Sequence, residues 1–326
     1  MKILDYANGI QNTSSQELTI AQKILGEFLK VKRSISDCDE NCHHCQVPHL
    51  DKVYESVRKN HPIEFVLPAF PGKSPNLNKV LGHLPDLAEE QSLIFLNSLC
   101  ETIQEIYTPG AKIIICSDGR VFSDVVGMKE DHVTEYQMSI DSLITELKLS
   151  HLSTFHLDEI APGESFEAIR EALVLTHGRS IEQIRSDVKR GQAESAHSEI
   201  HRMYCGLVKF LVEDQLHPEI KISKSQIQKQ SRKKAYHMIQ RSNAWTNLIE
   251  ELFPSAVRLS IHPQACGSKK LGIQLLGKET WMTPWHGVAV KIDGKLRLMK
   301  RWQAEELGAN LVRDRNGKAR YFEVAQ

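Results

Sequence analysis

The chain has 326 residues, and its 41 lysine and arginine residues balance 41 aspartate and glutamate residues, so its formal net charge is zero. This balance excludes a general polyanion-binding protein, and 41% hydrophobic with 25% charged residues excludes a disordered chain. The sequence lacks the run of about 18 apolar residues that a membrane span needs, and it lacks an export signal. Seven cysteines, an odd number, suggest reduced thiols. We therefore expect a soluble cytoplasmic protein that does not bind nucleic acid or membranes.

The first half of the chain is predicted to alternate between helices and strands. Apolar residues recur at helical spacing in some segments and form short continuous runs in others, as in strands buried on both faces of a sheet. The predicted helices are 14–29, 87–107 and 133–149, and the predicted strands are 63–67, 112–116 and 152–157. The polar segment 34–52 is interpreted as a loop.

The second half is predicted to be a helical segment followed by strands. Helices are expected at 165–177, 181–190, 194–214 and 225–253, and strands at 256–261, 271–276, 288–292 and 296–299. Asp293-Gly294 and Asn316-Gly317 predict hairpin turns. We expect an α/β fold with a Rossmann-like mixed sheet, a helical insertion and antiparallel C-terminal hairpins. N-terminal helices and a cysteine-containing loop (1–60) would precede a catalytic domain (61–326).

A first candidate site follows the strand predicted at 63–67. Gly72-Lys73-Ser74 suggests a P-loop, but the required earlier glycine is replaced by Leu67, and Pro75 disfavours a helix start at this point. The stiff loop is still expected to hold Lys73 and Ser74 at the carboxyl edge of the sheet, where ligands bind in such folds. A solvated loop lysine is the alternative.

A second candidate site follows the strand predicted at 112–116. Asp118 and Arg120 should emerge at the same sheet edge as Lys73. A carboxylate beside a guanidinium suits proton transfer next to an anionic group. The alternative is an Asp-Gly turn with a structural ion pair.

Basic residues accumulate between Ile220 and Leu248, where no acidic residue occurs. Lys234 and Arg241 lie on one predicted helical face, and Arg185 is a further candidate cation. Such a face can bind a small anion such as phosphate, or it can simply be solvated.

One histidine follows the strand predicted at 256–261, and another precedes the strand predicted at 288–292. His262 and His286 are flanked by proline or glycine, and each can serve as a general acid or base near neutral pH. A core or turn histidine is the alternative for both. Trp285 is a weaker candidate for an aromatic pocket.

Three cysteines fall within a short polar segment. Cys38, Cys42 and Cys45 have side chains that bind zinc, but no second pair at finger spacing follows them. The preferred interpretation is a loop with ordinary thiols and no metal, with a local zinc site as the alternative.

Six motifs, in chain order, resemble those of the pyoverdine/dityrosine biosynthesis family, also called the tyrosine or tryptophan isocyanide (isonitrile) synthases. The motifs are FVLPAFPGKSPN, CSDGRVFSDVVG, HGRSIEQIR, SRKKAYHMIQRSNAW, VRLSIHPQ and TPWHGVAV. The resemblance runs from about Ile24 to Val290, and the cysteine segment at 38–45 also resembles the N-terminal cysteine region of that family.

The resemblance implies a Rossmann-like α/β fold and a condensation without a redox cofactor. The amino group of L-tyrosine or L-tryptophan would attack the keto carbon of ribulose 5-phosphate, which becomes the isocyanide carbon after carbon–carbon cleavage. An iron/2-oxoglutarate oxygenase would be the pathway partner. Catalysis is expected from Lys73, Asp118, His262 and His286, and substrate binding from Ser74, Arg120, Arg185, Lys234, Arg241 and Trp285. The alternatives are another sugar-phosphate lyase or isomerase and a zinc-binding regulatory protein.

Overall fold

A parallel five-stranded sheet forms the centre of the computed structural model, which describes residues 2–194, 199–216, 221–276 and 282–324. The spatial order of its strands is β3-β2-β1-β4-β5. The strands are β1 (Ile63–Pro68), β2 (Ala111–Ser117), β3 (Leu152–His156), β4 (Val257–Ser260) and β5 (Leu271–Gly272). The chain builds outward from β1 on one side and later returns to its other side. The order of the strands therefore reverses between β1 and β4, which creates a crevice at their carboxyl ends.

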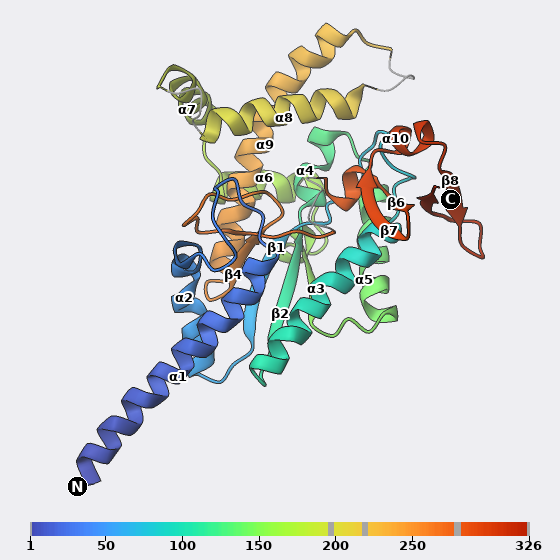
Figure 1. Cartoon of the computed structure of the whole chain (residues 1–326). Coiled ribbons are helices and arrows are strands. Elements are labelled where there is room, and N and C mark those ends of the chain that lie inside the picture. Colours follow the sequence, from blue (N-terminus) through green and yellow to red (C-terminus); the bar gives the residue numbers. More distant parts are fainter. Residues whose placement is uncertain (1, 195–198, 217–220, 277–281, 325–326) are drawn as a thin grey trace.

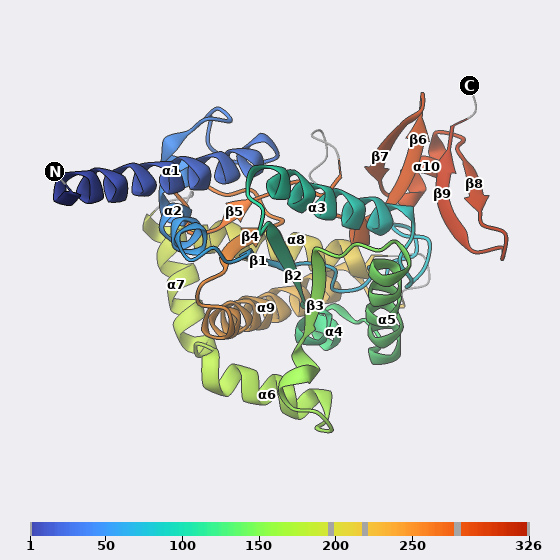
Figure 2. The ribbon, with the colours of Figure 1, turned by 90° about the horizontal axis from the view of Figure 1, so that it is seen from below.

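Helices cover both faces of this sheet (Figure 2). One face packs against α1 (Lys2–Lys30), α2 (His43–Arg58), α3 (Leu87–Ile106) and α5 (Glu130–Glu146). The other packs against α4 (Gly119–Val126), α6 (Phe166–His177) and α9 (Lys224–Leu252). Phe65 and Leu67 enter the first core and Val66 enters the second, because successive strand residues point to opposite faces. Burial on both faces explains the continuous apolar runs of β1 and β2.

The predicted helical insertion is confirmed. Helices α7 (Ile181–Glu194) and α8 (Glu199–Gln215) pack against each other and against α9, above the carboxyl edge of the sheet in Figure 1. Ser223 caps the N-terminus of α9 by accepting a hydrogen bond from the Gln226 backbone N–H.

The C-terminal segment forms a second sheet in the order β7-β6-β9-β8. Its elements are β6 (Val288–Ile292), β7 (Lys295–Met299), α10 (Arg301–Glu306), β8 (Asn310–Arg313) and β9 (Ala319–Glu323). Asp293 and Gly294 both have positive φ angles, 50° and 74°, as the predicted hairpin turn requires. The expected antiparallel C-terminal hairpins are confirmed by the pairs β6/β7 and β8/β9, but the expected mixed character of the central sheet is wrong. The central sheet is parallel throughout, and the separate C-terminal sheet is mixed because β6 pairs with β9 in parallel.

Two local expectations are also corrected. The predicted loop 34–52 is helical from His43, because α2 buries residues at four-residue spacing against the core, including His49 and Val53. The predicted strand 271–276 pairs in the sheet only over β5, because Ile273 forms an antiparallel bridge with Lys32 instead.

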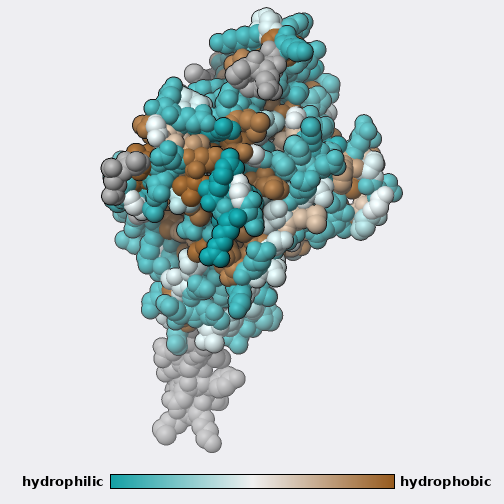
Figure 3. Space-filling view, turned by 90° about the vertical axis from the view of Figure 1, so that its right-hand side faces the viewer, coloured by the Kyte–Doolittle hydropathy of each residue, from teal (hydrophilic) through white to brown (hydrophobic). Residues whose placement is uncertain are grey.

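Two short 3₁₀ helices complete the fold, η1 (Leu157–Ile160) and η2 (Pro284–His286). Among the described residues, no helix is long and apolar enough to cross a membrane. The face shown in Figure 3 is largely hydrophilic, with an apolar area near its middle.

Candidate active site at the carboxyl edge of the sheet

The loops after β1 and β2 lie in close contact at the carboxyl edge of the sheet. Gly119 has no side chain, and a Cβ atom at this position would lie 2.0 Å from the Pro71 carbonyl oxygen. Only glycine permits this approach, so the N-terminus of α4, where Asp118 is the N-cap, is fixed against the loop that carries Lys73. The expectation that Lys73 and Asp118 emerge at one sheet edge agrees with this arrangement.

Lys73 is buried within a network of hydrogen bonds. Its Nζ atom lies 2.7 Å from Asp86 Oδ2, 2.8 Å from Glu89 Oε2 and 3.1 Å from the Pro284 carbonyl oxygen. These three acceptors match its three N–H groups. The two carboxylates outweigh desolvation and raise the pKa of Lys73 above its usual value, although burial is the largest single influence and acts to lower it. Lys73 is thus an ammonium group held by the core. The alternative of a solvated loop lysine is wrong, because the side chain is fully buried.

Glu89 is a fully buried carboxyl group of this network. Burial raises its pKa to about 7, while the Lys73 ammonium opposes that rise. Tyr136 donates a hydrogen bond of 3.3 Å to Glu89 Oε1. Asp86 also caps α3, since it accepts a hydrogen bond from Ala88 and its own N–H donates to Glu89. The network therefore ties the loop after β1 to the N-terminus of α3.

Asp118 lies directly after β2, and Arg258 of β4, two strands away in the sheet, is near enough for its charge to act on it. Burial raises the pKa of Asp118 to about 7, and the charge of Arg258 opposes this rise. Asp118 Oδ1 is buried and has no hydrogen-bond partner among the described residues. A carboxyl group with this pKa changes its protonation state near neutral pH, as a general base or acid requires.

Arg258 is a buried guanidinium with unused hydrogen-bond donors. Its side chain is 8% exposed, and Nε and Nη1 find no partner within the described part of the chain. Burial lowers its pKa to about 10, so it still carries its positive charge at neutral pH. Lys270 contributes a second cation close by, with a pKa that burial and Arg258 lower. A buried arginine without an acceptor is a site for an anion.

His286 lies beside the Lys73 loop, at the end of η2. Burial lowers its pKa well below the usual value, and the charges of Lys79, His262 and Lys73 add to this effect. Nδ1 has no partner among the described residues, and the ring packs edge-on against Phe210 at 5.0 Å. His286 is therefore a neutral imidazole at neutral pH.

His262 follows β4, and its side chain is accessible to solvent. Surrounding protein atoms nevertheless lower its pKa, with further contributions from the charges of Arg33 and Lys270. His262 is also near enough to His286 for its charge to lower the pKa of that residue. The structure thus brings both predicted histidines to the same side of the sheet as Asp118.

Ser74 belongs to a second buried polar cluster. Its hydroxyl donates a 3.0 Å hydrogen bond to Asp214 Oδ1 at the end of α8. Lys79 donates to the same carboxylate and lies over the Phe210 ring. Asp214 Oδ2 remains without a partner among the described residues. Ser74 thereby links the loop after β1 to the helical insertion.

A cavity of about 290 Å³ opens beside the same loop. This volume is close to the lower end for small-molecule sites, about 300 Å³. Its wall is mostly apolar and includes Leu77, Met128 and Val133, and the polar residues that line it include His83, Lys129 and His132. Val133 lies against Gly119, since a Cβ atom there would be 2.9 Å from Val133 Cγ1. The cavity is therefore adjacent to the Asp118 turn.

Arg120 binds the first turns of α5. It is 2% exposed, its Nη1 atom lies 2.6 Å from Glu130 Oε2, and its guanidinium covers the Phe166 ring at 3.8 Å. Arg170 binds the same Glu130 carboxylate at 2.8 Å. Arg120 thus forms structural ion pairs with Glu130, and the expected pairing of its guanidinium with the Asp118 carboxylate is not formed.

Two of the three predicted cations of the helical insertion lie near the Asp124 carboxylate. Arg241 Nη2 donates a 2.9 Å hydrogen bond to Asp124 Oδ2. Lys234 is half-buried, with a pKa that burial lowers and Asp124 raises. Arg185 is exposed and lies over the Tyr236 ring at 5.3 Å. These cations face the α4 side of the sheet edge and are separate from the Lys73 network.

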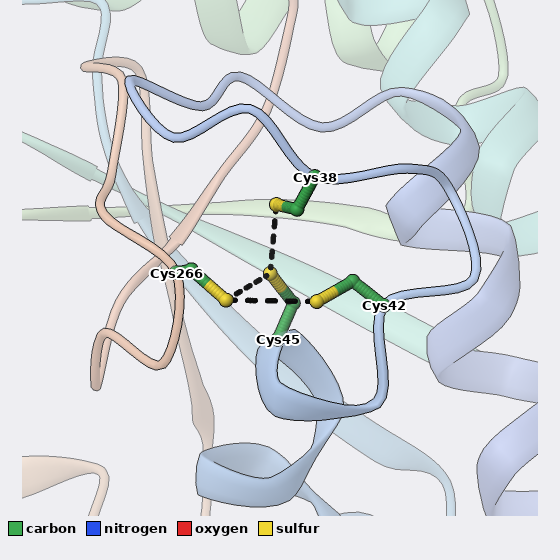
Figure 4. A group of neighbouring side chains, drawn as sticks. All are labelled: Cys38, Cys42, Cys45 and Cys266. Carbon is green, nitrogen blue, oxygen red and sulfur yellow. Dashed lines mark hydrogen bonds between the residues drawn. The ribbon is translucent and has the colours of Figure 1, made fainter.

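The predicted aromatic and metal-binding residues also have clear positions. Trp285 is 2% exposed and packs against Phe70 in the main core, with ring centroids 5.3 Å apart. Cys38, Cys42 and Cys45 lie together, and the structure adds Cys266 to them (Figure 4). The sequence patterns did not indicate Cys266 as a metal ligand or Arg258 as a site residue. An arginine within the apolar run Val257–Ser260 is the signal that would have indicated Arg258.

Comparisons with known proteins agree with this architecture. A family model described as pyoverdine/dityrosine biosynthesis protein matches residues 53–312. The L-tryptophan isonitrile synthase AmbI2 of Fischerella ambigua is 45% identical over 94% of this chain and 93% of its own length. The L-tyrosine isonitrile synthase of Xenorhabdus nematophila is 41% identical, over 93% and 91%. The crystal structure of the PvcA protein of Pseudomonas aeruginosa superimposes with a TM-score of 0.89 at 38% identity, covering 94% of this chain and 100% of that one.

Proposed function

Because this chain belongs to the pyoverdine/dityrosine biosynthesis family, it is an isonitrile synthase, and we propose that it condenses L-tryptophan or L-tyrosine with ribulose 5-phosphate. The family match covers most of the chain, and relatives named for each amino acid are similar over nearly their whole length. The substrate amine supplies the nitrogen, and the keto carbon of the sugar becomes the isocyanide carbon.

The observation that carries this proposal is that Asp118 and Arg258 both have buried polar atoms without a hydrogen-bond partner among the described residues. An α-amino acid presents an ammonium and a carboxylate on neighbouring atoms. Arg258 has free donors for the carboxylate, and Asp118 has a free oxygen and a pKa of about 7 for the ammonium proton. Removing that proton is required before the nitrogen can attack a carbonyl carbon.

The histidines fit the proton transfers that follow the attack. Imine formation expels the keto oxygen as water, which needs one proton donor, and the later carbon–carbon cleavages move protons on and off sugar hydroxyls. His286 is neutral with a free Nδ1, and His262 lies near enough for its charge to act on it. We assign them the sugar-side acid and base roles, while Lys73 holds its loop in place from within the core.

The phosphate and the aromatic ring require separate surfaces. Lys234, Arg241 and Arg185 provide positive charge balanced mainly by Asp124, and they are our candidates for the phosphate. The apolar cavity beside Gly119 is our candidate for the aromatic ring. Ser74 and Arg120 are assigned to support of these surfaces, because each is buried as well as hydrogen-bonded to protein groups.

The wider setting of the reaction follows from the fold and the chemistry. The order β3-β2-β1-β4-β5 is the order of the first five strands in a Rossmann fold, which supports a Rossmann-like description with the site at the reversal point. None of the seven cysteines forms a disulfide bond, which fits a reducing cytoplasm. An iron/2-oxoglutarate oxygenase that consumes the isocyanide is the proposed pathway partner.

A coupled assay tests the proposal. Purified protein is incubated with ribulose 5-phosphate, isotopically labelled at its keto carbon, and with L-tryptophan or L-tyrosine in parallel. We expect one of the two reactions to give an isocyanide whose terminal carbon carries the label. Unlabelled product would refute the sugar as the carbon source. Consumption of the sugar phosphate without either amino acid would instead indicate a lyase or an isomerase.

A further inference from the structure

Four cysteine sulfur atoms lie together between the N-terminal segment and the loop that follows β4 (Figure 4). The Sγ–Sγ distances are 3.7 Å for Cys38–Cys45, 3.5 Å for Cys42–Cys266 and 3.6 Å for Cys45–Cys266. All four Sγ atoms lie within 4.8 Å of one another. The sulfurs converge on one point, although Cys266 is more than two hundred residues from the other three.

These distances fit one tetrahedral metal ion. Zinc binds thiolate sulfur at about 2.3 Å, so the edges of a regular ZnS₄ tetrahedron measure about 3.8 Å. The measured separations of 3.5–3.7 Å are close to this value. The thiolates of an iron–sulfur cluster bind different iron atoms and therefore lie farther apart. Disulfide bonds would need sulfur atoms about 2.05 Å apart.

The surroundings of the sulfurs supply hydrogen bonds that a charged tetrathiolate requires. Lys32 Nζ donates to Cys38 Sγ at 3.2 Å. The Gly267 backbone N–H donates to Cys45, and the positive φ of Gly267, 75°, makes this turn favourable for glycine. Cys42 and Cys45 lie at the N-terminal end of α2, where the helix dipole favours negative charge. Four thiolates and one divalent cation carry a net charge of −2, which these groups partly offset.

We propose that Cys38, Cys42, Cys45 and Cys266 bind one zinc ion in a structural site that fixes the loop between β4 and β5 to the N-terminal segment. Ligand identity, ligand number and closed geometry are those of structural zinc sites, which leave no open position for catalysis. The sequence alone suggested at most three ligands, because the fourth comes from a distant loop.

The loop held in this way includes the segment directly after His262. Ser34 and Gln264 form a bridge, and the Arg33 backbone N–H donates to the Gly272 carbonyl at 2.7 Å. Cys266 N–H donates to the Ser36 hydroxyl at 2.9 Å. Zinc would therefore stabilise the position of His262 at the edge of the candidate active site without touching substrate.

Metal analysis of the full-length protein tests the site. Protein purified under reducing conditions without added metal should contain one zinc ion per chain by elemental mass spectrometry. Cys266→Ser should lose the zinc, while Cys205→Ser should keep it, because Cys205 is an exposed cysteine on α8. Cys266→His should also retain metal, since imidazole nitrogen can replace a thiolate.

The wild-type protein gives an independent readout if a variant fails to fold. Cobalt exchange should produce the visible absorption of tetrahedral Co²⁺ with thiolate ligands, and zinc X-ray absorption should show four sulfur neighbours. Chelation should lower the melting temperature, and zinc should restore it. The absence of zinc in the wild-type protein, iron in its place, or full zinc content in Cys266→Ser would overturn the proposal.

Discussion

Replacement of Asp118 by asparagine separates its cost to stability from its role in catalysis. Burial raises the pKa of Asp118 from 3.8 to about 7. This rise in the pKa corresponds to a free energy of about 4 kcal/mol, which is an upper bound because the side chain is partly accessible to solvent. Since the folded state binds this proton more tightly than the unfolded state, wild-type stability should fall as the pH rises from about 4 to about 7. Asparagine does not ionise, so Asp118→Asn should become more stable than wild type across this range and remain so at pH 8.

The assay is urea-induced unfolding at pH 5 and pH 8, combined with the pH profile of kcat/KM. We expect a gain of about 1–3 kcal/mol at pH 8, a smaller gain at pH 5, and a loss of turnover of about 100-fold or more. The wild-type profile should fall on its acidic side with a midpoint near the pKa of Asp118. Asp51→Asn, at an exposed position on α2, is the matched control and should change neither quantity. Destabilisation of Asp118→Asn at pH 8, or turnover at the wild-type rate, would refute the reasoning.

Three further substitutions test the surrounding geometry. Lys73→Met leaves Asp86 and Glu89 buried without a cation, so it should lower the free energy of unfolding in urea by about 3–5 kcal/mol at pH 8. The loss should be smaller at pH 6, because Glu89 can then be protonated. An equal loss at both pH values would contradict this. Arg258→Met should raise KM for the amino acid about 10- to 100-fold. The melting temperature should be unchanged or higher, because the substitution removes buried donors that have no acceptor among the described residues. An unchanged KM would exclude Arg258 as the group that binds the substrate carboxylate. Gly119→Ala should destabilise the protein by about 1–3 kcal/mol through its clash with the Pro71 carbonyl, which thermal unfolding would show or disprove.

Much of the fold was predictable because strands buried on both faces have a distinct sequence pattern. The apolar runs of β1 and β2 satisfy two cores at once, so they could be recognised without knowledge of their partners. The extent of β5 could not be recognised in this way. Its apolar run continues, but the backbone of Ile273 pairs with Lys32, a residue from the far end of the chain. The pairing of β6 with β9 is likewise decided by tertiary packing.

The arrangement of the site residues could likewise be predicted only in part from the sequence. The position of Asp118 at the sheet edge follows from its place directly after a buried strand. The partners of Lys73 do not follow, because Asp86 and Glu89 belong to a helix that only the fold brings beneath its loop. The unsatisfied guanidinium of Arg258 is visible only in three dimensions, since the sequence shows a charge in a strand but not the absence of an acceptor. Whether these residues act as assigned stays a prediction until the variants are measured.

The enclosure of Lys73 determines which nitrogen is available for covalent chemistry. A lysine that forms a Schiff base needs an unprotonated amine and access to a carbonyl group. Lys73 has neither, since its ammonium donates to two carboxylates and the Pro284 carbonyl and its pKa is raised. Borohydride added during turnover should therefore leave Lys73 unmodified. The amine that captures the ketone then belongs to the amino acid, so the enzyme and the sugar need not be joined by a bond that must later be broken.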